Sequence, residues 1–298
     1  MKRAAVSASR AKDFLQCPLM FRFRAIDRIP EPPSQAAVKG SLVHSVLERL
    51  YDLPAVERTE EVAERLVDPQ WASLLSRDPE CLKMFDSEPE LSAWMGEARA
   101  LVRAYFRLEN PRRLEPAARE RFVEVEISDG VLLRGYVDRI DVAPNGATRV
   151  VDYKTGKAPN PRFANEALFQ MRFYALLLWR LDGVRPSRLQ LIYLGNGQTI
   201  TLDPTAEELI DFEQQVLEIW NRIETAARSG TFEARRTPLC PWCSFQALCP
   251  LFGGTPPPLP EEGVEQLLTA RRGTSQEADV SGPWPPDTRH APHGDRRA

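Results

Sequence analysis

The stretch from Leu133 to Lys157, LRGYVDRIDVAPNGATRVVDYKTGK, constrains the fold more than any other part of the chain. Asn145-Gly146 divides it into two strand-like runs, and Asn-Gly between such runs is a strong signal for a hairpin turn. Upstream, FVEVEI alternates apolar and acidic residues, and the turn signal Asp129-Gly130 follows it. The sequence therefore predicts a three-stranded antiparallel meander that begins near Arg121.

This meander brings two carboxylates and a lysine within reach of one point. Residues two apart on a strand share a face, so Asp152 and Lys154 point the same way. Asp138 lies on the partner strand across the turn and can lie beside them. Two carboxylates with open coordination suit Mg²⁺ or Mn²⁺, and such an ion activates water and stabilises charge on an attacked phosphate. The alternative, from these residues alone, is a surface salt bridge in a hairpin.

A helix is predicted from about Val38 to Tyr51, because apolar residues recur there at i, i+3, i+4 and i+7. His44 lies about 100° around the axis from Val43, at the edge of the apolar stripe, and can face sideways into a cleft. A lone histidine in this position is usually an ordinary residue of a helix surface. His44 becomes a candidate ligand only if other features agree.

A second helix is predicted from about Asn165 to Leu181, and its apolar residues on nearly every side place it against the sheet. Gln170 and Tyr174 are four residues apart and share one face of this helix. Two polar groups on one face of a buried helix indicate a polar neighbour there. A satisfied hydrogen bond within the core is the alternative.

The other segments are assigned more briefly. A short helix is expected within residues 7–23, with its end at Cys17-Pro18. Residues 188–194 and 198–202 are expected to form strands. Residues 205–228 are expected to form a long helix opened by a capping box at Thr205 to Glu208. Several helices joined by charged linkers around Pro54, Pro69, Pro79 and Pro89 are expected over 52–110. Residues 254–298 are rich in Pro, Gly and charge and are expected to be mostly disordered.

Composition (43% hydrophobic, 27% charged) is typical of a soluble globular protein. The chain has no apolar run of about 20 residues and no apolar core of a secretory signal near its start, so we expect a cytoplasmic protein without membrane contact. Residues 1–50 carry nine Lys and Arg against four Asp and Glu, whereas residues 52–98 carry four against twelve. The basic segment suits a polyanion. Two ordinary solvated surfaces explain the same charges.

Four of the five cysteines have the spacing of a metal site. Cys240, Cys243 and Cys249 crowd one short segment, and Cys17 can supply a fourth thiolate, whereas Cys81 stands alone. In a cytosolic chain such clustering favours metal binding over disulfides. Thiolate chemistry alone leaves zinc and an iron–sulfur cluster open.

Read together, these motifs resemble the PD-(D/E)xK nucleases of the RecB-like exonuclease group, in family order over most of residues 1–252. GSLVH (40–44) resembles the helix that carries a metal-binding histidine, which assigns His44 as a ligand. GYVD (135–138) and VVDYKTG (150–156) resemble the catalytic strands. The resemblance implies Asp138, Asp152 and the carbonyl of Tyr153 as metal ligands and Lys154 as the catalytic lysine. FQMRFY (169–174) resembles the Q-x-x-x-Y motif, so Gln170 and Tyr174 are expected to contact DNA or shape the site.

The resemblance also implies a cofactor and a fold. AddB-type nucleases and the related CRISPR adaptation nuclease have a one-plus-three cysteine pattern that holds a [4Fe–4S] cluster, here Cys17, Cys240, Cys243 and Cys249. The implied fold is α/β (α+β): a restriction-endonuclease-like core with a central mixed sheet flanked by helices, and a cluster that joins the N- and C-terminal parts. The nuclease domain is expected to span 1–252, with a helical insert at 52–110, a cysteine loop at 236–252 and a tail at 253–298.

The expected activity is Mg²⁺- or Mn²⁺-dependent hydrolysis of DNA, as an exonuclease on single-stranded or frayed ends in repair or recombination. A non-catalytic DNA-binding or scaffold subunit that keeps the fold and the cluster is the second hypothesis, and a zinc-stapled structural protein is the third. No G-x-x-x-x-G-K-[ST] loop is present, so any helicase would be a separate partner.

Overall fold

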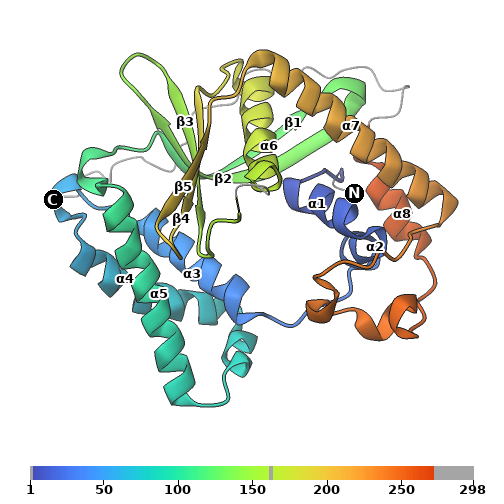
Figure 1. Ribbon diagram of the computed structural model, residues 1–298, viewed down its shortest axis with the longest axis horizontal. Helices are drawn as coiled ribbons and strands as arrows, with labels where there is room; N and C mark the ends of the chain where they lie inside the picture. Colours follow the sequence, from blue (N-terminus) through green and yellow to red (C-terminus); the bar gives the residue numbers. More distant parts are fainter. Residues whose placement is uncertain (1–2, 161–163, 272–298) are drawn as a thin grey trace, which may run out of the picture.

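The computed structural model describes residues 3–160 and 164–271. A five-stranded sheet with the order β1-β2-β3-β4-β5 lies at its centre (Figure 1). The strands are β1 (Ala118–Glu126), β2 (Leu132–Val142), β3 (Thr148–Lys154), β4 (Arg188–Tyr193) and β5 (Gln198–Leu202). Neighbouring strands are antiparallel except β3 and β4, which are parallel. The sheet is therefore mixed, as expected, and the predicted meander forms its first three strands.

Each of the two hairpin turns contains a glycine in the left-handed backbone region. Asp129 and Gly130 have φ values of 58° and 69°, and Gly146 has a φ of 83°. Glycine reaches this left-handed region without steric cost, and Asp and Asn tolerate it better than other residues. The first turn sets the register in which Phe122 lies opposite Tyr136. The parallel pair β3–β4 requires a crossover instead, and α6 (Ala164–Asp182) supplies it.

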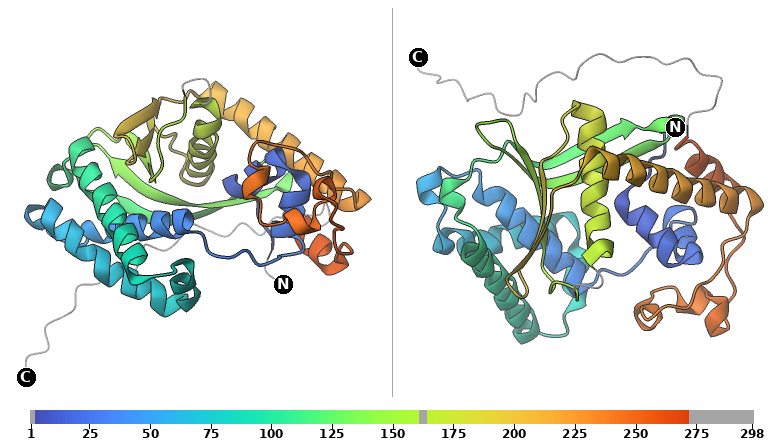
Figure 2. Two further views of the ribbon diagram at one scale, coloured as in Figure 1. Left: turned by 60° about the horizontal axis from the view of Figure 1, so that its bottom comes forward. Right: turned by 45° about the horizontal axis from the view of Figure 1, so that its top comes forward.

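Helices cover both faces of the sheet, and each face has its own core (Figures 1 and 2). On one side α6 and α7 (Ala206–Ser229) pack with Val150 of β3. On the other side α3 (Gln35–Leu50), α4 (Glu60–Arg77) and α5 (Glu88–Leu108) pack with Val151 and Tyr153 of the same strand. The side chains of β3 therefore alternate between two apolar cores, which fixes the strand in position. No helix within 3–160 and 164–271 has the length and apolar character needed to cross a bilayer.

Burial overrides local sequence signals in two helical segments. The expected linker at Pro69 is wrong, because this proline lies inside α4, which is anchored by the buried side chains of Val67 and Trp71. The expected disorder from 254 onward is wrong for α8 (Glu261–Leu268), whose Leu267 is 5% exposed and packs into the core. The rest of the expected tail, 272–298, lies outside the described residues.

The helix expected over 7–23 consists of two helices. Cys17 is extended, with a φ of −158°, and separates α1 (Ala8–Gln16) from α2 (Pro18–Ala25). Pro18 takes the first position of α2, where its missing N–H is not needed. The break therefore places Cys17 at a corner between two helices rather than within a helix.

The two ends of the described chain meet at the start of β2. The N–H of Arg134 donates to the carbonyl of Val6 at 2.8 Å, and the N–H of Leu132 donates to the carbonyl of Ala270 at 2.8 Å. Consequently α1 and α2 lie beside α7 and α8 (Figures 1 and 2). The strand that carries Asp138 is thus held by segments from both ends.

Candidate active site and cysteine cluster

Three of the predicted metal-binding groups converge where α3 meets β2 and β3. The Nε2 atom of His44 lies 2.8 Å from the carbonyl oxygen of Tyr153, and its Nδ1 atom lies 3.4 Å from Oδ2 of Asp138. The same Asp138 oxygen accepts a hydrogen bond from the N–H of Tyr153 at 2.9 Å. An imidazole from a distant helix therefore faces a carboxylate and a carbonyl of the meander.

The other four predicted residues form a connected chain of polar contacts beside this point. Nζ of Lys154 lies 2.7 Å from Oδ2 of Asp152, so the two side chains share one side of β3 as predicted. The same Nζ donates to Oε1 of Gln170 at 3.0 Å. Nε2 of Gln170 donates to Oδ1 of Asp152 at 3.0 Å and to the hydroxyl of Tyr174 at 2.7 Å. The amide of Gln170 thus fixes the orientation of both charged groups.

Electrostatics of the site favour a bound cation. Burial, together with the nearby charge of Asp152, raises the pKa of Asp138 well above its usual value. Two carboxylates in a region with little water repel each other unless a proton or a cation lies near them. Carboxylates, a carbonyl and an imidazole form a donor set that suits a divalent ion such as Mg²⁺ or Mn²⁺. The residues present therefore fit the metal that the resemblance implies.

Lys154 is held in its charged form. Burial alone would lower the pKa of this lysine, but the ion pair with Asp152 and the proximity of Asp138 outweigh burial and raise it. The ammonium group therefore keeps its proton at neutral pH. This state suits the stabilisation of negative charge and the orientation of a bound group.

Glu120 of β1 is a candidate ligand that the sequence analysis missed. Its carboxylate, His44 and Asp138 place ligand atoms within 4.8 Å of one another. Glu120 also has a φ of 42°, which is rare for a residue with a side chain. The β1–β2 pairing places it level with Asp138, between the pairs Arg119–Arg139 and Arg121–Val137. Counting outward from the Asp129-Gly130 turn would have identified it.

Replacing Glu120 with Gln is expected to stabilise the metal-free protein at pH 8 and to weaken metal binding. Burial and the charge of Asp138 raise the pKa of Glu120 from 4.5 to about 7. The folded protein therefore holds a proton that the unfolded chain has already lost, and stability falls as the pH rises from 4.5 through 7. Glu120→Gln lacks this loss, so its Tm without metal should be about 2–4 °C higher at pH 8.

Thermal unfolding at pH 5 and pH 8, with EDTA and with Mn²⁺, measures this effect. At pH 5 the two proteins should have the same Tm, and with Mn²⁺ at pH 8 the wild type should be the more stable because it retains the ligand. An identical gain in Tm from Mn²⁺ in both proteins would exclude Glu120 from the metal site.

Arg139 forms a buried polar network behind the metal-binding carbonyl. It is 1% exposed and donates hydrogen bonds to the hydroxyls of Tyr51, Tyr105 and Tyr153. Its guanidinium also pairs with the carboxylate of Glu109 at 2.8 Å. Because the network joins α3 and α5 to Tyr153, it fixes the residue whose carbonyl faces His44. No local pattern predicts this network, since DRID (138–141) is an ordinary strand sequence.

Gly135 leaves room for Tyr174. A Cβ atom at this position would lie 2.9 Å from Cε1 of the Tyr174 ring. We expect Gly135→Ala to push this ring aside and to disturb its hydrogen bond with Gln170, at a cost of about 1–3 kcal/mol of stability. Urea unfolding checks this value. The double variant Gly135→Ala/Tyr174→Leu should recover part of the loss, and no recovery would place the strain elsewhere.

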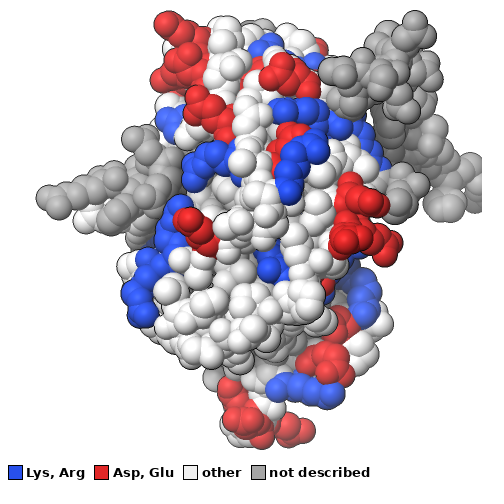
Figure 3. Space-filling model, turned by 90° about the vertical axis from the view of Figure 1, so that its right-hand side faces the viewer, with Lys and Arg blue, Asp and Glu red and all other residues white. Residues whose placement is uncertain are grey.

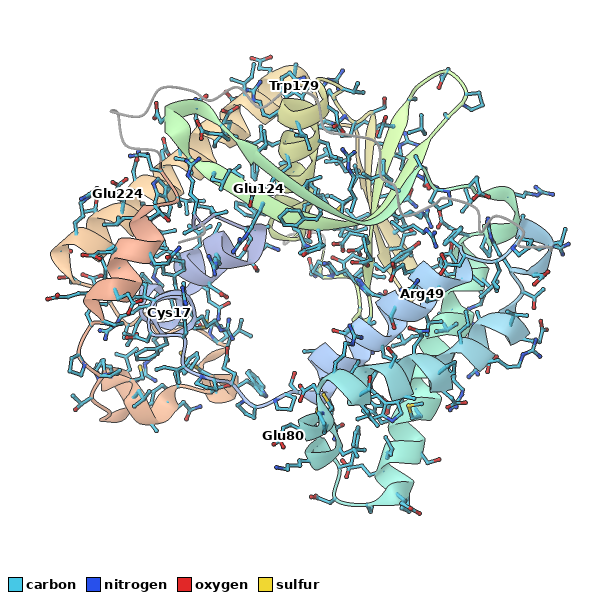
Figure 4. All side chains as sticks on the ribbon, turned by 180° about the vertical axis from the view of Figure 1, so that it is seen from behind. Cys17, Arg49, Glu80, Glu124, Trp179 and Glu224 are labelled. Atoms are coloured by element: carbon cyan, nitrogen blue, oxygen red, sulfur yellow. The ribbon has the colours of Figure 1, made fainter. Side chains whose placement is uncertain are left out.

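Cys17 lies beside the loop that holds the other three predicted cluster ligands (Figure 4). The loop folds into three short 3₁₀ helices, Cys240–Trp242, Gln246–Leu248 and Pro250–Phe252. Backbone N–H groups point at sulfur atoms: that of Arg235 at Cys17 (3.5 Å) and that of Thr237 at Cys240 (3.2 Å). Burial raises the pKa of Cys243, and the neighbouring Cys17 and Cys240 raise it further.

Four cysteine thiolates form a donor set that suits either zinc or an iron–sulfur cluster. Hydrogen bonds from backbone N–H groups stabilise the negative charge that cluster sulfurs carry.

The cysteine loop also presents an uncharged surface. Residues 237–260 contain no Lys, Arg, Asp or Glu. In the face shown in Figure 3, charged side chains are absent from the lower centre, where this loop lies. Trp242 is 78% exposed, so it does not shield the cysteines, whereas Phe14, Phe21 and Phe245 are buried.

Comparison with known proteins identifies the family. The model of the PD-(D/E)XK nuclease superfamily matches residues 5–250. The chain belongs to this superfamily. Asp152-Tyr153-Lys154 has the sequence of the (D/E)XK part of this name, whereas Asp138 is preceded by Val137 rather than by proline. PD-(D/E)XK nucleases use divalent metals, and in this member the group of His44, Glu120 and Asp138 could hold one.

Two phage proteins and one solved structure resemble this PD-(D/E)XK member. The Gene 69 protein of Mycobacterium phage L5 is 31% identical over 127 residues, which are 42% of this chain and 41% of that protein. The Gene 69 protein of Mycobacterium phage D29 is 23% identical over 268 residues, which are 83% of this chain and 96% of that protein. A candidate exonuclease from Eubacterium rectale shares the fold, with a TM-score of 0.55 and 16% identity over 80% of this chain and 86% of that one.

Proposed function

We propose that this protein is a metal-dependent DNA nuclease, an exonuclease that acts on single-stranded or frayed ends in DNA repair or recombination. The observation that carries the proposal is the convergence of His44, Asp138 and the Tyr153 carbonyl beside the Asp152–Lys154 ion pair. Membership of a nuclease superfamily and the shared fold with a candidate exonuclease support it.

The proposed ligands of a Mg²⁺ or Mn²⁺ ion are His44, Asp138, Asp152, the carbonyl of Tyr153 and the additional Glu120. When bound, such an ion lowers the pKa of a coordinated water and neutralises charge on the phosphate. The protein's own contribution is to hold these groups in place before the substrate arrives.

Lys154 is the proposed catalytic lysine. Its ammonium group is held by Asp152 and Gln170 at the edge of the ligand group. There it can stabilise the negative charge that develops on the phosphate and orient the attacking water. Gln170 and Tyr174 are proposed to keep Lys154 and Asp152 in these positions, because their hydrogen bonds connect the two.

We further propose that the chain is a RecB-like nuclease with an AddB-type [4Fe–4S] cluster on Cys17, Cys240, Cys243 and Cys249. The backbone N–H groups that point at Cys17 and Cys240 support this cofactor. In this proposal residues 1–252 form the nuclease domain, and residues 52–110 form a helical insert within it. The cluster would join the first helices to the segment after α7.

One digestion assay tests the activity. DNA oligonucleotides labelled at either the 5′ or the 3′ end are incubated with the full chain in Mg²⁺, Mn²⁺ or EDTA. Stepwise shortening from one end of a single strand, only with metal, is the expected result. Internal cuts would overturn exonuclease action, and the absence of cleavage with either metal would favour the non-catalytic DNA-binding alternative.

A further inference from the structure

Four arginines surround a cavity of about 300 Å³ between α1, the end of α2, β2 and α8. They are Arg3, Arg10, Arg28 and Arg134. The guanidinium of Arg3 is occupied by the carboxylate of Glu126. The other three line the cavity and form no ion pair with a carboxylate in the described part of the chain. None of them belongs to the motifs described above.

The charge of these three arginines is only partly balanced within the described residues. Arg28 and Arg134 form no ion pair there, although the β1–β2 register places Glu124 opposite Arg134. Burial and the guanidiniums of Arg134 and Arg28 lower the pKa of Arg10, against a smaller opposing effect of Asp13. Positive groups that repel one another in a half-buried cavity bind an anion readily. A phosphate group matches the guanidinium geometry.

An exposed aromatic pair lies between this cavity and the metal site. Phe122 and Tyr136 face each other across β1 and β2, with ring centroids 5.1 Å apart. They are 43% and 59% exposed, respectively. A cross-strand aromatic pair stabilises a hairpin, but so large an exposed fraction leaves ring faces free. Exposed ring faces of this kind are platforms on which bases of single strands stack.

The strand β2 places the three features in one line. Arg134, Tyr136 and Asp138 are two residues apart in succession, while the intervening Gly135 packs against α6 and Val137 is buried. The spacing along a strand separates Arg134 from Asp138 by about 13 Å. A few nucleotides of an extended strand span this distance. The order along it is phosphate site, base platform and metal site.

We propose that single-stranded DNA follows β2, with one phosphate at Asp138, a base stacked on Phe122 and Tyr136, and a further phosphate among Arg10, Arg28 and Arg134. This inference rests on the proposed nuclease function and specifies its substrate as an unpaired strand. A base in a duplex is already stacked and paired, so it cannot use the aromatic platform without leaving its helix.

Binding and cleavage are measured separately to test this path. Fluorescence anisotropy of a labelled oligothymidylate with the full chain in EDTA reports binding, and hydrolysis of bis(p-nitrophenyl) phosphate in Mn²⁺ reports the metal site alone. Arg28→Ala and Arg134→Ala should each weaken oligonucleotide binding by about tenfold. Each should also lower the slope of log K against log salt by about 0.7. Hydrolysis of the small diester should stay unchanged.

Two controls complete the experiment. Arg107→Ala removes an exposed arginine of α5 that does not line the cavity, and this variant should bind the oligonucleotide as the wild type does. Tyr136→Ala should weaken binding by at least about fivefold, because a stacked base is lost, whereas Tyr136→Phe should restore it. Rescue by Phe identifies the aromatic ring, rather than the hydroxyl, as the group that binding requires.

The outcomes separate the path from the activity. If Arg28→Ala and Arg134→Ala bind the oligonucleotide as tightly as Arg107→Ala, the path along β2 is wrong, whether or not the protein cleaves DNA. If the wild type hydrolyses neither substrate with Mn²⁺ but the arginine variants lose binding, the path stands and the proposed nuclease function fails. Equal losses on a duplex of the same length would overturn the preference for an unpaired strand.

Discussion

Asp152→Asn is expected to reduce metal-dependent DNA cleavage by about 10³-fold or more while the protein remains folded. The side chain is 1% exposed, and its two oxygens contact Lys154 and Gln170. An amide of the same size keeps the packing but removes the negative charge that a divalent ion requires. It also leaves Lys154 without its ion-pair partner. The initial rate of oligonucleotide degradation in Mn²⁺ measures the loss.

Asp203→Asn is the matched control for this substitution. Asp203 forms an exposed ion pair with Arg188 at 2.7 Å, and such surface pairs contribute about 0–1 kcal/mol. The Asp203→Asn variant should therefore match the wild type in activity and in Tm. Lys154→Met should be as inactive as Asp152→Asn. Full activity of Asp152→Asn or of Lys154→Met would mean that the site is assigned to the wrong strand.

Cys243→Ser is expected to cause the largest loss of stability. A serine hydroxyl is a poor ligand for iron, so the purified variant should lack the brown colour and the iron of the proposed cluster. The cluster would close a loop between Cys17 and Cys240, and in the chain-entropy model closing so long a loop stabilises by about 5 kcal/mol. For a domain of this size the Tm should fall by about 10–20 °C.

Cys81→Ser is the control for the cluster. Cys81 is buried in the helical insert, where its thiol donates to the carboxylate of Asp78 at 3.5 Å, and it is not one of the four predicted ligands. This variant should keep its iron and its colour. Iron analysis and calorimetry of both variants distinguish the possibilities. A stoichiometric zinc ion in the wild type, with no iron, would contradict the iron–sulfur assignment.

The sheet was predictable because its signals are local. Asp129-Gly130 and Asn145-Gly146 are turn sequences whose conformations few other residues adopt, and the flanking runs have strand periodicity. The shared side of Asp152 and Lys154 follows from the alternation of a single strand. The position of His44 was accessible only through the family resemblance, because no local pattern connects a helix to a strand about a hundred residues away.

Other features depend on tertiary packing and left little trace in the sequence. Pro69 remains in a helix because Val67 and Trp71 are buried on either side of it. Arg139 looks like a surface residue of a strand, yet tyrosine hydroxyls and a carboxylate from two helices surround it. Its burial could not be inferred from neighbours in sequence. Glu120 differs, since the hairpin register alone would have placed it beside Asp138.

The pairing of both chain ends with β2 has a consequence for protein synthesis. The backbone of β2 bonds to Val6, which is made early, and to Ala270, which is made late. Chains grow at about 5–20 residues per second, and contacts between distant residues form only when both partners exist. The hydrogen bond between Leu132 and Ala270 therefore cannot form until residue 270 has left the ribosome. In a ribosome-bound fragment that ends before α8, the start of β2 would lack this support.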